Sequence, residues 1–83
     1  MEKDAVVSEI VRVLSPYLGA TMAAASTRAQ CEKLGIAGDA ISAAQAEALI
    51  AKLAAGLAVF VGREKSALVV GEIRRAIDPG ARA

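Results

Sequence analysis

Residues 53–61 are the most apolar stretch of the chain, and they restrict its possible folds more than any other feature. The stretch carries no charge, includes the only phenylalanine, Phe60, and lies between two segments whose apolar residues recur at helical spacing. Because exposed apolar surface is unfavourable in water, neighbouring helices must cover such a stretch. We therefore expect the remaining chain to pack around residues 53–61.

The composition favours helices over strands. Roughly a quarter of the 83 residues are alanine, and Tyr17 and Phe60 are the aromatic residues. Alanine has the highest helix propensity, whereas sheets are enriched in β-branched and aromatic residues. We predict an all-α fold, with residues 1–83 forming one compact, Ala-rich domain of four to five helices. Alanine faces bury little area, so we expect the domain to gain burial as a homo-oligomer.

Two helices are expected in the first part of the chain. Asp4 is a suitable N-cap for the first, and Pro16 disfavours helical backbone at Ser15, so we expect a bend there and a second helix from Pro16 to Leu34. Gly35 would end that helix. The apolar rows of the second helix are Leu18, Met22, Ala25 and Ala29 and, beside them, Ala20, Ala24, Cys31 and Leu34.

The third helix should begin at Ser42, because Ser42 and Gln45 have the spacing of a capping box. We favour an end or a kink near Gly56, followed by a short buried turn around residues 57–60. A continuous helix to Val61 is the alternative.

A last helix is expected from about Arg63 to Ile77, after a break at Gly62. The Asp-Pro-Gly sequence that follows Ile77 would stop it, and we expect residues 79–83 to form a frayed tail.

Composition also argues against several kinds of chemistry. The formal charge is +1, which gives no long-range attraction to nucleic acid or to an anionic membrane. The chain has no histidine and a single cysteine, Cys31, so the commonest general base, the commonest metal ligand and an internal disulfide are missing. We expect no enzyme activity, no cofactor and no metal. With no signal-peptide pattern and an apolar run of nine residues against the ~20 that span a bilayer, we expect a cytoplasmic protein without membrane contact.

One segment has the spacing of a nucleic-acid-binding motif. Cys31 is followed four positions later by Gly35 and ten positions later by Ile41. This spacing resembles the DNA-binding helix-turn-helix, and the resemblance implies a recognition helix that begins near Gly38. The alternative function is therefore a DNA-associated regulator that uses residues 27–45.

The charge of this segment favours a simpler interpretation. No lysine or arginine lies between Lys33 and Lys52, and only Ser42 and Gln45 offer groups suited to base edges. We prefer to interpret Cys31 as a packed residue in a helix that ends at a glycine.

A weak anion site is a further candidate. Arg63 and Lys65 lie where the last helix is expected to begin, and the free backbone N–H groups of a helix start attract anions. A solvated first turn is the preferred interpretation, because true anion sites need several converging donors.

The main functional hypothesis is a small, non-catalytic helical module for protein–protein interaction or oligomerisation, acting as an adaptor or scaffold. Apolar residues outside the tightest inward rows are the candidate contact face. They are Val11, Val59, Val61 and Leu68. We expect a protein partner, and self-association above all. A small-molecule pocket around Phe60 is a third possibility.

Overall fold

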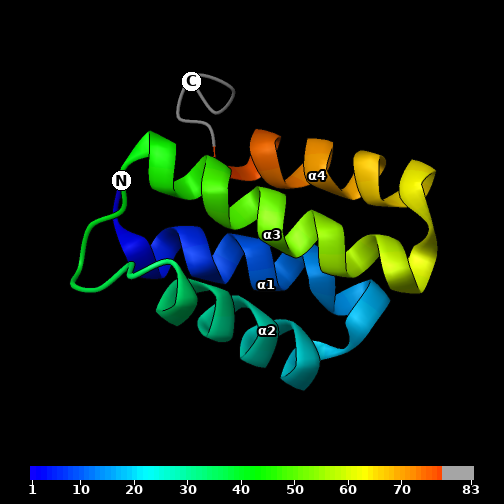
Figure 1. Ribbon diagram of the computed structural model, residues 1–83, viewed down its shortest axis with the longest axis horizontal. Coiled ribbons are helices and arrows are strands. Elements are labelled where there is room, and N and C mark those ends of the chain that lie inside the picture. The colour runs from blue at the N-terminus through cyan, green and yellow to red at the C-terminus, as the bar shows by residue number, and fades with distance from the viewer. Residues whose placement is uncertain (78–83) are drawn as a thin grey trace.

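The computed structural model describes residues 1–77, which form an all-α bundle of four helices (Figure 1). The helices are α1 (Lys3–Leu18), α2 (Ala20–Lys33), α3 (Ala43–Val61) and α4 (Arg63–Ile77). Successive helices run in opposite directions, and α1 and α3 each pack against both α2 and α4. The predicted all-α bundle is confirmed, and within residues 1–77 the only extended pairing is an isolated bridge between Glu2 and Ala40.

Single glycines join the helices at one end of the bundle. Gly19 connects α1 to α2 with φ 84° and ψ 151°, and Gly62 connects α3 to α4 with φ 87° and ψ 165°. This region of backbone space is essentially restricted to glycine, because a Cβ atom there collides with the peptide groups. Figure 1 shows both joints at the same end, with the residue 34–42 connection at the other.

The first helix ends later than predicted. Helix α1 begins after Glu2, with Asp4 in its first turn, and continues through Pro16 to Leu18. Pro16 lies in the last turn, where its missing N–H removes one intrahelical hydrogen bond without breaking the helix. The reversal needs a positive φ, which Gly19 adopts readily and Ser15 does not.

Helix α3 is continuous, so the predicted break near Gly56 and the short buried turn around residues 57–60 are wrong. The predicted start is confirmed: the Ser42 hydroxyl accepts from the Gln45 backbone N–H, and the Gln45 side chain accepts from the Ser42 N–H. A glycine within a helix costs about 1 kcal/mol, which is too little to interrupt a helix of 19 residues with a buried leucine row. Leu57 is buried as expected, but Phe60 is 68% exposed.

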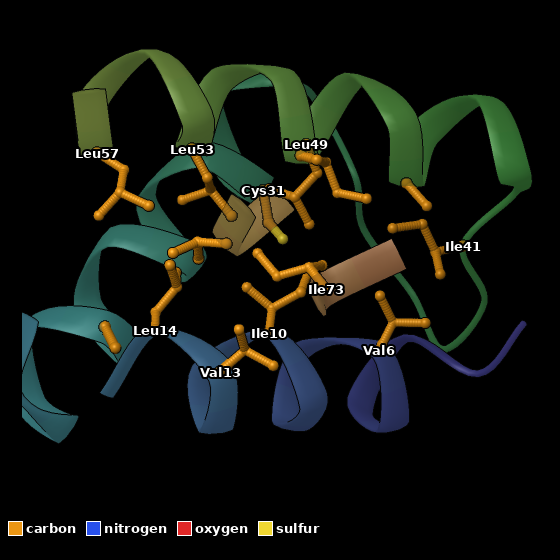
Figure 2. Close-up of a cluster of buried hydrophobic side chains, with 14 of the residues drawn as sticks. Val6, Ile10, Val13, Leu14, Cys31, Ile41, Leu49, Leu53, Leu57 and Ile73 are labelled. Carbon is orange, nitrogen blue, oxygen red and sulfur yellow. The ribbon is translucent and has the colours of Figure 1, made fainter. Parts of the chain in front are cut away.

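The core lies between all four helices (Figure 2). In Figure 2, Ile10 and Leu14 of α1 point toward Leu49 and Leu53 of α3, with Ile73 of α4 between them. The buried apolar side chains are Val6, Ile10, Val13, Leu14, Ala23, Cys31, Ile36, Ile41, Ala46, Leu49, Ile50, Leu53, Leu57, Val69 and Ile73. The buried residues of α1, α3 and α4 recur three or four positions apart, as is typical of the inward face of a helix.

The row predicted for α2 is rotated from the observed one. Ala23, Thr27 and Cys31 face the core, whereas Met22 is 50% exposed. Thr27 is fully buried, and its hydroxyl donates to the Ala23 carbonyl, 2.8 Å away. Helix α2 contains five alanines among its 14 residues and few large apolar side chains. Its faces therefore differ little, and its rotation follows from its neighbours.

Two further contacts position the elements. The Ser66 hydroxyl of α4 donates to the Ala54 carbonyl of α3, 2.9 Å away. At the opposite end, the Lys3 ammonium donates to the Ile36 carbonyl, and Met1 and Ile41 exchange backbone hydrogen bonds. The residue 34–42 connection is thereby held against the start of α1. The predicted frayed tail, residues 79–83, lies outside the described residues.

Candidate functional site

The four predicted contact residues do not form one surface. Val59 is 85% exposed and Leu68 is 68% exposed, whereas Val11 and Val61 are half-buried against the core. Val11 lines a shallow groove between α1 and α2. Leu68 lies on α4, with Glu64 and Glu72 one helical turn before and after it. Val59 is therefore the most exposed member of the set.

The charges of the chain are unevenly distributed over the bundle. Residues 13–27 and residues 53–62 contain no acidic or basic side chain. The first segment includes the joint at Gly19, and the second includes the joint at Gly62. Because both joints lie at the same end of the bundle (Figure 1), the fold brings the two uncharged segments together.

A narrow apolar groove lies between these two segments. It has a volume of about 100 Å³, and its floor is formed by buried leucines of α1 and α3. Leu18 and Met22 line it from one side, and Lys52, Gly56 and Phe60 of α3 line it from the other. We call the surface formed by Leu18, Met22, Gly56, Val59 and Phe60 the apolar end.

Met22 and Phe60 are the parts of this surface that sequence reasoning missed. Met22 was placed in an apolar row of a helix and Phe60 in a short buried turn, because apolar residues in such patterns are usually core residues. The informative signal was the absence of charge over residues 13–27 and 53–62. A surface that was exposed only to water would normally carry charged side chains over such lengths.

The groove does not resemble a small-molecule pocket. Its 100 Å³ is below the roughly 300–1,000 Å³ typical of ligand sites. Phe60 stands at its edge with most of its surface exposed, so the ring encloses nothing. The geometry therefore favours contact with another surface over a bound small molecule around Phe60.

Arg63 and Lys65, the candidate anion residues, form the charged margin of the apolar end. Both side chains are exposed at the start of α4. The nearby Ser66 hydroxyl is buried and already donates to the Ala54 carbonyl, so it does not add a donor to an anion there. The two residues remain a weak candidate, without a third side chain directed to the same point.

The helix-turn-helix alternative fits the observed connection poorly. Helix α2 ends at Lys33 and α3 begins at Ala43, which leaves a connection of nine residues. The motif uses a turn of about three or four residues. The recognition helix implied near Gly38 is not formed, because the capping box of Ser42 sets the start of α3.

Cys31 is buried among apolar side chains, and no metal cluster accompanies it. Within residues 1–77, no group of three or more acidic, cysteine or histidine side chains lies close enough to bind a metal ion. Burial raises the pKa of the Cys31 thiol above its ordinary 9.0, and the positive charge of Lys3 opposes part of the rise. A thiol in this environment is a poor nucleophile.

This pKa predicts a loss of stability in alkali. The folded chain holds the thiol proton more tightly than the unfolded chain, so stability from this group is complete below pH 9 and is lost as the pH rises beyond it. Urea unfolding at pH 8 and pH 10 should show the decline, and Cys31→Ala should decline less. An equal decline in both proteins would contradict this assignment.

Helix α3 has a further property that bears on partners. By length and composition alone it could cross a membrane, although only 28% of its most apolar window is buried within the bundle. Core helices of globular proteins pass the same test. Here Leu49, Ile50, Leu53 and Leu57 of α3 are buried core residues, which favours the packed helix.

Comparisons of the chain with protein-family models, with curated proteins and with solved structures found no match.

Proposed function

We propose that this chain is a small non-catalytic interaction module that self-associates through the apolar end. The observation that carries the proposal is the exposure of Met22, Val59 and Phe60 at a groove in which Lys52 is the one charged lining residue. Exposed apolar surface of this kind commonly marks a protein interface. Exposed aromatic residues and methionine are also enriched in interfaces over the rest of a protein surface.

The exposed area limits the size of the contact. A phenylalanine side chain buries about 150–250 Å² when it is covered, so the 68% of Phe60 left exposed corresponds to about 100–170 Å². The apolar end consists of five residues, whereas a standard interface uses about 20–30 residues on each side. We therefore expect a weak, concentration-dependent dimer rather than a permanent one.

The charge of the chain is compatible with two copies meeting. A net charge of +1 produces little repulsion between molecules, and low net charge favours association. The margin of the apolar end carries both signs, with Arg63 and Lys65 on either side of Glu64. Charges of opposite sign at this margin can therefore pair between two copies.

Replacing Phe60 by aspartate should abolish self-association. We expect the mass of the wild-type chain in light scattering to rise from monomer toward dimer between about 10 µM and 1 mM, which matches an interface of this size. Phe60→Asp should remain monomeric over that range, because the variant loses the apolar area of the ring and the contact would have to strip water from a carboxylate, which costs free energy even where a cation lies opposite. Helicity by circular dichroism should be unchanged, since the side chain is already exposed.

Leu68→Asp is the matched control. Leu68 and Phe60 are equally exposed, at 68%, but Leu68 lies on α4 outside the apolar end. Leu68→Asp should therefore dimerise like the wild type. A wild-type chain that stays monomeric at 1 mM, or an equal loss of association in both variants, would refute the proposal.

A further inference from the structure

Gly56 is a glycine that this chain does not need for its own packing. It lies within α3 without a positive φ, and a Cβ atom placed on it would meet no atom within 4 Å. Every other small residue exposed on α3 is alanine, which is the better helix former. A glycine without an internal reason is expected where another backbone approaches closely.

Gly56 is part of the apolar end. Gly56 lines the groove together with Phe60, one turn further along α3, and Lys52, one turn before. Lys52 is the only charged residue between Glu47 and Arg63, and within residues 1–77 it has no ion-pair partner. On this face of α3, Gly56 has no side chain. The Phe60 ring lies one turn after it and the Lys52 ammonium lies one turn before it.

We propose that two copies of the chain cross at Gly56, with α3 packed antiparallel against α3 about a two-fold axis that is perpendicular to both helices. This inference rests on the self-association proposed above and specifies its geometry. In an antiparallel contact of this kind, a residue before the axis meets the residue that lies equally far beyond the axis in the other copy. Lys52 of each copy therefore faces Phe60 of the partner subunit, and the two Gly56 residues meet each other.

This arrangement places each Lys52 ammonium against the aromatic ring of Phe60. A lysine ammonium over an aromatic face makes a cation–π contact, and the lysine methylene groups cover apolar surface. The two Lys52 residues lie eight helical residues apart across the axis, about 12 Å along the helices at 1.5 Å per residue. That separation exceeds the roughly 8 Å screening length at physiological salt, so repulsion between them is small.

Cysteine cross-linking tests the axis directly. The side chain at position 56 should meet its own copy, so Gly56→Cys should form a disulfide-linked dimer with oxidised glutathione at least 10-fold faster than Ala48→Cys. Ala48 is also exposed on α3 but lies about 12 Å from the axis, so its two copies are about 24 Å apart, far beyond the 7 Å limit for Cα atoms in a disulfide. The wild type should not cross-link, because Cys31 is buried.

A bulky residue at the crossing gives a second, independent measurement. Gly56→Gln should weaken self-association at least 10-fold in light scattering, while its melting temperature in dilute solution stays equal to the wild-type value or rises, since glutamine is the better helix former. Ala48→Gln should keep the wild-type association.

The outcomes separate this inference from the proposed function. If the wild type dimerises but Gly56→Cys gains no selectivity and Gly56→Gln associates normally, the α3 crossing is wrong and self-association stands. If the chain stays monomeric, both proposals fail. If the monomer instead co-sediments with phosphatidylcholine vesicles and Phe60→Asp abolishes this, lipid occupies the apolar end and the inference is overturned.

Discussion

Replacing Leu49 by alanine should lower the free energy of unfolding by about 2–5 kcal/mol. Leu49 is 0% exposed and lies in the centre of the core, directed toward α1 (Figure 2). The loss combines the transfer of the deleted methyl groups with the cavity that they leave. A domain of this length is stable by about 4–12 kcal/mol, so the substitution should remove a large part of its stability.

Urea unfolding measured at low protein concentration checks this prediction. Leu68→Ala is the matched control, because it deletes the same atoms from a side chain that is 68% exposed, and it should change stability by less than about 0.5 kcal/mol. If Leu49→Ala is unfolded at 25 °C, Leu49→Met should still fold, with a loss below about 1.5 kcal/mol. A loss of under 1 kcal/mol in Leu49→Ala would show that Leu49 is not at the centre of the core.

Replacing Gly62 by alanine should destabilise the chain by about 1–3 kcal/mol. No atom blocks a Cβ at this position, so the cost comes only from the backbone conformation, with φ 87° and ψ 165°. For a domain of this size, the melting temperature should fall by about 4–8 °C for each kcal/mol. If the variant avoided this backbone strain, the joint between α3 and α4 would have to change its conformation.

The same glycine-to-alanine substitution at position 56 should change the stability in the opposite direction. Gly56 is helical and also has space for a Cβ, so alanine should stabilise the monomer by up to about 1 kcal/mol. Thermal unfolding followed by circular dichroism in dilute solution gives both values. The assigned backbone conformation at Gly62 would be incorrect if Gly62→Ala melted at the wild-type temperature or above.

Local patterns predicted most helices of this fold. The Ser42–Gln45 capping box and the glycine at position 62 were interpreted correctly, because both act through hydrogen bonds or dihedral angles within a few residues. The leucines of α3 recur every three or four residues, and this spacing alone places them on one face. The end of α1 was predicted too early because of Pro16. A proline near a helix end costs only one hydrogen bond, and the chain reverses its direction at Gly19.

The candidate site was less accessible to sequence reasoning. Val59 was identified as an apolar residue off the inward rows, but Phe60 was assigned to a buried turn. Whether a neighbouring helix covers residues 57–60 depends on the length of that helix, and the residues close to 57–60 in the sequence do not specify it. In the folded chain, α2 does not cover Phe60. Phe60 and Met22 of α2 are both exposed, on the two sides of a groove.

The sequence by itself determined that this chain is helical, where α3 begins, and which faces of α1, α3 and α4 are apolar. Only the tertiary structure decided the rotation of α2, the exposure of Phe60 and the meeting of two uncharged segments at one end of the bundle. The physical reason is range. Periodicity and capping act between residues three or four apart, whereas the covering of a surface depends on helices far apart in the chain.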